Sequence, residues 1–140
     1  QVILTHSHFD HAGLLPRIRE RFHPKVYAHP RSRSDGIIPL SDRQEIQIGE
    51  QTCMAVHTPG HSDDSICILC EEEHLLFSGD APMRIYSNDG EFPSQFLDAY
   101  ELFVSAGVKT IYPGHGEQVT QNVPHLMEES LRNIRRSRIV

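Results

Sequence analysis

The residues best suited to chemistry in this sequence are histidines and aspartates crowded into one short stretch near its start. The segment Thr5–His11 reads THSHFDH and contains His6, His8, Asp10 and His11. Burying so many imidazole and carboxylate groups without partners would cost several kcal/mol. Coordination of a metal ion removes this cost, because neutral imidazole and carboxylate both donate lone pairs. The stretch therefore predicts a metal site.

Further candidates occur later in the chain, each directly after a predicted strand. They are His61, Asp80 and His115, and a glycine that allows a sharp backbone turn precedes each of them. Because strand ends in a shared sheet meet at one edge, we expect these side chains to join the first group. The complete set of candidate metal ligands is His6, His8, Asp10, His11, His61, Asp80 and His115.

This ligand set is too large for one ion, since a catalytic Zn²⁺ takes about three protein ligands and a water. We predict two ions. All donors are nitrogen or oxygen, which favours Zn²⁺, although Fe or Mn would accept the same set. Two divalent ions, two aspartates and a bridging hydroxide leave a net charge of roughly +1, which would stabilise an oxyanion. We therefore hypothesise a dinuclear hydrolase in which a metal-activated hydroxide attacks the substrate, with Asp10 as the catalytic residue that orients it or relays its proton.

Alternating short strands and helices must position these groups, which makes the fold class α/β, in one domain over residues 1–140. The predicted strands are Val2–Thr5, Val26–Ala28, Glu45–Ile48, Thr52–His57, Ser65–Cys70, Leu75–Ser78 and Thr110–Tyr112. Residues 30–44 and 81–93 are predicted loops. The predicted helices are Ala12–Phe22, Ser94–Ala106 with Ser94 as its cap, and a last helix capped by Asn122. Apolar residues at helical spacing mark the inward face of that last helix: Leu126, Met127, Leu131 and Ile134.

Composition excludes several classes of protein. The 140 residues are 38% hydrophobic and 23% charged, values typical of one soluble domain. A net charge of −6 disfavours a nucleic-acid partner. No apolar run approaches the roughly 20 residues of a membrane span. We expect a cytoplasmic domain with a small-molecule substrate and no nucleic-acid or membrane partner.

The cysteines are predicted to be ordinary. Cys53, Cys67 and Cys70 do not suggest a disulfide framework. Cys67 and Cys70 lie in one predicted strand, where residues three apart point to opposite faces. We therefore expect unpaired sheet cysteines in a reducing compartment.

Several residues near the candidate ligands have two interpretations. His57 precedes the turn before His61 and is either an ordinary histidine or a support for a ligand. The segment Ser62–Asp64 follows His61 and would either orient it or form part of a plain turn. The remaining histidines are expected to lie outside the site: His23, His29, His74 and His125.

At these residues the sequence resembles the metallo-β-lactamase fold superfamily. THSHFDHAG fits the family's H-x-H-x-D-H signature, HTPGHSDDSI its P-G-H segment, LLFSGDA its G-D segment and IYPGHG its closing G-H motif. The motifs occur in family order across residues 2–117. The resemblance implies one ion on His6, His8 and His61. It implies that the second ion is bound by Asp10, His11 and His115, with Asp80 bridging the two.

The resemblance also implies a four-layer αββα sandwich with the metal site at one edge of its two sheets. Members usually precede the first motif with several strands, whereas this chain starts inside the strand that carries the motif. We therefore expect most of the N-terminal half-sandwich to be missing. An apolar sheet face would then need a partner chain or a second copy, as in a homodimer, to supply the missing strands.

Departures from the family's patterns narrow the expected activity. The bridging position is Asp80, where common zinc β-lactamases carry Cys. His8 stands where flavodiiron proteins carry Glu, and Met83 stands where lactonases carry Tyr. The sequence is most similar to small glyoxalase II-like hydrolases, which implies an ester, thioester or lactone substrate. The alternative is an iron-dependent oxidoreductase of the same fold, similar to persulfide dioxygenases. A third interpretation is an inactive or structural piece.

Overall fold

The computed structural model describes residues 1–140 as four helices and ten strands. In chain order the elements are β1 Val2–Ile3, α1 Phe9–Ala12, α2 Leu15–Phe22, β2 Val26–Ala28, β3 Ile38–Pro39, β4 Gln44–Ile48, β5 Gln51–His57, β6 Ile66–Cys70, β7 Leu75–Gly79, β8 Glu91–Phe92, α3 Ser94–Ser105, β9 Thr110–Pro113, α4 Val123–Arg136 and β10 Arg138–Ile139. The strands predicted from hydrophobic runs are all present, with ends shifted by one or two residues.

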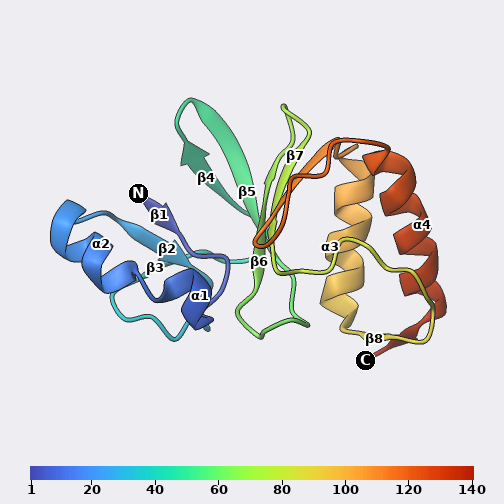
Figure 1. Cartoon of the computed structure of the whole chain (residues 1–140), viewed down its shortest axis with the longest axis horizontal. Helices are drawn as coiled ribbons and strands as arrows, with labels where there is room; N and C mark the ends of the chain where they lie inside the picture. The colour runs from blue at the N-terminus through green and yellow to red at the C-terminus, as the bar shows by residue number, and fades with distance from the viewer.

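A five-stranded sheet in the order β4-β5-β6-β7-β9 stands at the centre of the molecule (Figure 1). Neighbouring strands in this sheet are antiparallel, except β7 and β9, which run parallel to each other. The middle strand β6 is buried along its whole length. Its side chains alternate between faces, so Cys67 and Leu69 join one core cluster while Ile66 and Ile68 join another. A continuous apolar run therefore becomes a strand that is covered on both sides.

Helices α3 and α4 cover one face of this sheet, on the right in Figure 1. The predicted inward face of α4 is confirmed: Met127, Leu131 and Ile134 are buried, and Leu126 packs at their edge. On α3, Phe96, Tyr100 and Phe103 are buried against the same strands. None of the four helices has the length and apolar character needed to cross a membrane.

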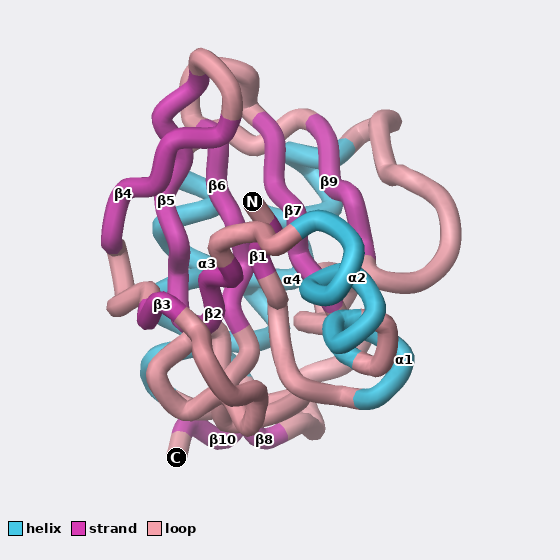
Figure 2. Tube along the Cα trace, turned by 90° about the vertical axis from the view of Figure 1, so that its left-hand side faces the viewer, coloured by secondary structure: helices cyan, strands magenta, loops and turns pink.

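A smaller parallel sheet, β1-β2-β3, faces the other side of the large sheet (Figure 2). Apolar residues between the sheets, Leu40 and Ile46 among them, form one core cluster. A second cluster, which includes Leu4, Leu15 and Val26, packs helix α2 onto the small sheet. The layers run helix, sheet, sheet, helix, which confirms the predicted αββα arrangement with a reduced N-terminal half.

The structure corrects several local predictions. The predicted helix Ala12–Phe22 is two elements, α1 and α2, with a break between them. The predicted loop at residues 30–44 contains the short strand β3, and the predicted loop at residues 81–93 contains β8. Strands β8 and β10 pair in parallel, and neither was predicted, because two-residue strands carry no periodic signal. The cap of α3 is Pro93 rather than Ser94, whose backbone N–H donates to the carbonyl of Val140. Asn122 does occupy the cap position of α4, but its side chain makes no capping bond.

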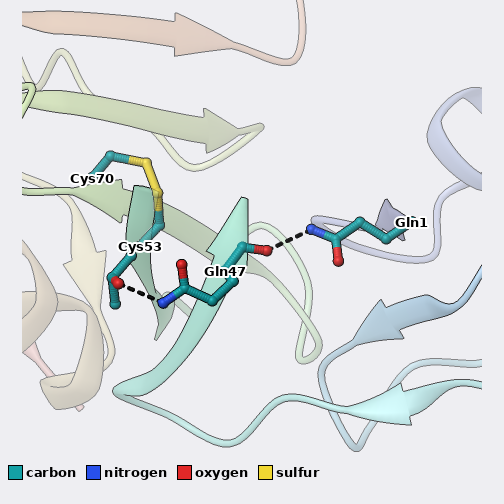
Figure 3. The surroundings of a disulfide bond; sticks show 5 residues. Gln1, Gln47, Cys53 and Cys70 are labelled. Atoms are coloured by element: carbon teal, nitrogen blue, oxygen red, sulfur yellow. Dashed lines mark hydrogen bonds between the residues drawn. A yellow bond between two sulfur atoms is a disulfide. The ribbon is translucent and has the colours of Figure 1, made fainter. Parts of the chain in front are cut away.

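The prediction of unpaired cysteines is wrong for two of the three. Cys53 on β5 and Cys70 on β6 are joined by a disulfide, with their Cα atoms 4.4 Å apart (Figure 3). The strand register places them opposite each other, on the face turned toward the small sheet. Cys67 lies on the other face and is free, so the predicted opposite orientation of Cys67 and Cys70 is confirmed. Nearby, the side chain of Gln1 donates to the carbonyl of Gln47 at 2.7 Å, which ties the start of β1 to β4 (Figure 3).

Thiol counting tests the pairing. Unreduced protein should incorporate about one alkyl group when denatured and about three after reduction, measured by mass spectrometry. The native protein should incorporate none, because Cys67 is buried and burial raises the pKa of its thiol to about 12. Reduction should lower the free energy of unfolding by about 3 kcal/mol, because a bridge across 17 positions restricts the conformational entropy of the unfolded chain by about that amount. Three alkyl groups on unreduced protein would contradict the disulfide, and a Cys53→Ser, Cys70→Ser variant should be indifferent to reductant.

Candidate metal centre

The structure brings all seven predicted ligands together in two groups, with the donor atoms of each group within 4.8 Å of one another. The first cluster is His6, His8 and His61, and the second cluster is Asp10, His11, Asp80 and His115. The segment from β1 to α1 carries the first four ligands. The others follow strands of the large sheet: His61 comes after β5, Asp80 after β7 and His115 after β9. The site therefore lies where the two sheets meet.

Local backbone geometry sets these side chains close together. His8 is the extended residue before α1, so the single helical turn that follows it carries Asp10 and His11. Two glycines leave no room for a side chain. A Cβ on Gly79, whose φ is +52°, would approach Thr5 to 2.8 Å, and a Cβ on Gly114 would collide with Asp80 Oδ1. The glycines before two of the ligands are therefore required by close packing as well as by turning.

The first cluster directs imidazole nitrogens at one point. His61 Nε2 lies 3.2 Å from His6 Nε2 and 2.9 Å from His8 Nδ1. His6 is 1% exposed, and burial, reinforced by neighbouring histidines such as His11, lowers its pKa. Its Nδ1 is 3.1 Å from the Thr5 hydroxyl, which leaves Nε2 free to face the cluster. Neutral, oriented imidazoles of this kind are what a metal ion requires.

Asp80 connects the two clusters. Its Oδ1 lies 3.2 Å from His11 Nε2, while its Oδ2 lies 3.3 Å from His115 Nε2 and 3.5 Å from His61 Nε2. Yet Oδ1 is buried and accepts no hydrogen bond in the structure. An unsatisfied buried carboxylate oxygen among lone-pair donors is costly, and a bound cation would satisfy it. This oxygen shows that the residues present fit a metal ion.

Asp10 is the exposed carboxylate of the second cluster. Its Oδ2 is 2.9 Å from His115 Nε2 and 3.5 Å from His11 Nε2. Partial desolvation would raise the pKa of Asp10, but a backbone hydrogen bond and the two histidines outweigh it and hold that pKa below its ordinary value. Asp10 is therefore ionised at neutral pH and reachable from solvent, as the predicted catalytic residue must be.

A buried carboxylate behind the first cluster ties its loops together. Asp64 accepts hydrogen bonds from Ser7, between His6 and His8, at 2.5 Å, and from Ser62, after His61, at 2.7 Å. Burial would raise the pKa of Asp64, but these two hydroxyls outweigh it and lower the pKa. Ser62 and Asp64 thus support the site, as one interpretation of the sequence proposed. Sequence reasoning missed Ser7, because a lone serine between two histidines carries no distinctive signal.

His57 also contacts this region. Its Nε2 is 3.0 Å from the carbonyl oxygen of Asp63, so it supports the turn that follows His61. The ring of His57 stacks on His29 with centroids 4.0 Å apart. His29 is buried, and burial, with the neighbouring His57 and Arg31, lowers its pKa. The other histidines expected outside the site lie in neither cluster: His23, His29, His74 and His125.

Comparison with known proteins shows the family to which the chain belongs. The model of the metallo-beta-lactamase superfamily matches residues 1–115. An atrochrysone carboxyl ACP thioesterase of Aspergillus fumigatus is 34% identical over 134 residues, which cover 93% of this chain and 31% of that protein. An archaeal metallo-beta-lactamase superfamily protein from Sulfolobus tokodaii has a TM-score of 0.69 at 21% identity, covering 93% of this chain and 65% of its own. A protein solved in a di-iron-bound form has a TM-score of 0.64 at 22% identity, covering 88% of this chain and 73% of its own.

The chain therefore belongs to the metallo-beta-lactamase superfamily, as its four motifs indicated. It spans about a third of the length of the fungal relative and corresponds to part of the fold of the archaeal protein. The His and Asp clusters and the family together support metal binding. The nitrogen and oxygen donors of the two clusters suit iron as well as zinc.

Metal analysis tests the two clusters. We expect the purified protein to hold about two equivalents of divalent metal, because the donors form two groups and Asp80, in the second group, also approaches His6 and His61 of the first. Asp80→Ala should lose metal from both groups, and His61→Ala mainly from the first, as measured by elemental analysis after gel filtration. His125→Ala is the control, since His125 is 70% exposed and lies in neither cluster. Full metal content in Asp80→Ala would refute its bridging position.

The buried His29 predicts a pH dependence of stability. His29 titrates near 6.5 in an unfolded chain and below that value in the fold, so the unfolded chain binds more protons between the two values. Stability should therefore fall as the pH drops below about 6.5. In urea titrations of metal-free protein at pH 7 and 5.5, His29→Gln should lose less stability on acidification than wild type, and the control His125→Gln should match wild type. An unchanged slope in His29→Gln would contradict the shift.

Proposed function

We propose that this chain carries the metal-binding part of a hydrolase that cleaves thioesters with water. The observation that carries the proposal is the pair of clusters joined by Asp80 and open to solvent through Asp10 and His115. The thioesterase name of the fungal relative points to the substrate class. His6, His8 and His61 would hold one divalent ion, and the second cluster the other. Bound there, such ions would polarise a carbonyl and lower the pKa of a water to about 7.

The protein's own nucleophiles are poorly suited to a covalent mechanism. Cys67 is fully buried, and its pKa is raised to about 12. Ser7 lies between two histidines, but its oxygen is held behind the first cluster, where it donates to the Asp64 carboxylate and accepts from the backbone N–H of Arg33. These observations favour water as the nucleophile.

Asp10 is the group placed to handle the proton of that water. It is ionised at neutral pH, exposed, and held by His115 at 2.9 Å. A carboxylate so fixed can orient an attacking water and accept its proton, a role typically worth 10²–10⁴ in rate. The histidines are arranged as lone-pair donors, so the site offers no evident acid for a leaving group. A thiol is acidic enough, with a pKa near 8.5, to leave as thiolate without one.

Activity assays test the assignment. The full-length, metal-loaded protein should hydrolyse an acyl thioester with release of one thiol, and chelation should abolish the reaction. Asp10→Asn should lower kcat by about 10²-fold or more while the protein stays folded. Asp98→Asn, an exposed carboxylate on α3, is the control and should keep full activity.

Two outcomes would count against this proposal. Full activity in Asp10→Asn would remove Asp10 from the mechanism. Bound iron together with oxygen uptake on a glutathione persulfide, without thioester hydrolysis, would favour the oxidoreductase alternative instead.

A further inference from the structure

Two grooves of different character include His61 in their lining. The first, of about 340 Å³, also reaches Asp80 and is lined mainly by prolines and phenylalanines. Its other carboxylate, Glu91, is paired with Arg138 at 3.2 Å. Its apolar and ring-bearing residues are Pro59, Pro82, Phe92, Pro93 and Phe96. The second, of about 420 Å³, reaches His8 and has no hydrophobic residue in its lining. Both grooves share Gly60 and His61, so they adjoin at this candidate metal ligand.

The polar groove contains two arginines without carboxylate partners. Arg31 and Arg33 are exposed and line it beside His8. The arginine ion pairs of the structure are made by other residues: Arg43, Arg132, Arg135 and Arg138. The groove also contains two carboxylates. Asp63 is exposed and forms no ion pair with either arginine, and the buried Asp64 accepts hydrogen bonds from the hydroxyls of Ser7 and Ser62. The two guanidinium groups are therefore available for an oxyanion.

The backbone that carries these arginines is fixed to the metal centre. The N–H of Arg33 donates to Ser7 Oγ at 2.9 Å, and Ser32 Oγ lies 2.8 Å from the same oxygen. The N–H of Arg31 donates to His29 Nδ1 at 3.2 Å. Ser7 in turn sits between His6 and His8. The segment is thus held at a set position relative to the first cluster, which lowers the entropy lost when a ligand binds.

We propose that Arg31 and Arg33 bind an oxyanion of the substrate while the apolar groove takes an uncharged part of its acyl group. This inference rests on the proposed thioester hydrolysis, because that reaction would place the scissile carbonyl beside His61, where the grooves meet. The oxyanion has two chemical sources in such a substrate: the phosphate of a phosphopantetheine arm on the thiol side, or a carboxylate on the acyl side. Arginine pairs suit both through bidentate hydrogen bonds.

Substrate comparison in the full-length, metal-loaded protein distinguishes these sources. The measured quantity is the ratio of kcat/KM for an anion-bearing thioester to that for a neutral acyl-N-acetylcysteamine thioester. Arg31→Gln, Arg33→Gln should lower this ratio about tenfold or more, mainly through KM, since each charged hydrogen bond contributes to binding. A drop with acyl-phosphopantetheine identifies phosphate, and a drop with a carboxyl-bearing acyl-N-acetylcysteamine identifies carboxylate. Arg17→Gln, an exposed arginine on α2 outside both grooves, should leave the ratio unchanged.

A binding experiment separates failure of this inference from failure of the proposed function. Calorimetry would measure how metal-free protein binds two probes: a non-hydrolysable phosphopantetheine thioether and a free acyl carboxylate. Weaker binding of either probe in the double variant supports the arginine site, even if wild type hydrolyses no thioester. An unchanged ratio for both anionic substrates overturns it, as does equal binding of both probes by variant and wild type.

Discussion

The rest of the structure depends on the mutual placement of lone-pair donors around Asp80. Imidazole nitrogens approach one another to about 3 Å, and a buried carboxylate oxygen in their midst accepts no hydrogen bond. Such an arrangement is unfavourable unless a cation occupies it. The features that maintain it are steric and polar. Gly79 and Gly114 give the loops room to approach, and Asp64 fastens the serines that flank three of the histidines.

The site also explains why the two sheets must pack closely. Four ligands come from the segment after β1 in the small sheet, and three come from strand ends of the large sheet. The backbone joins the halves directly, since the N–H of Ile66 donates to the carbonyl of Thr5 at 2.8 Å. The core cluster between the sheets therefore sets the geometry of the metal centre as well as stability. Helices α3 and α4 bury the far face of the large sheet (Figure 1), while His115, after β9, stays exposed to solvent.

Much of this was readable from local pattern. Alternating and continuous apolar runs located every strand that carries a ligand, and helical spacing located the buried face of α4. The pairing of β8 with β10 and the capping of α3 were not readable, because each depends on contacts with the distant C-terminus. The Cys53–Cys70 bridge was missed for a related reason. The bridge follows from the register of β5 and β6, which places the two cysteines opposite each other. The spacing of the cysteines in the sequence does not specify that register.

The sequence by itself determined the identity of the candidate ligands, because histidines and aspartates that recur just after strand ends are the residue types that bind metal ions. It also determined the family, because four motifs in order are a linear property. Only the tertiary structure decided which groups act together. Ser7 meets Asp64 across 57 positions. Arg31 and Arg33 come from the small-sheet side to line a groove with His61. Such contacts depend on how the two sheets pack, because packing brings together residues that are far apart in the sequence.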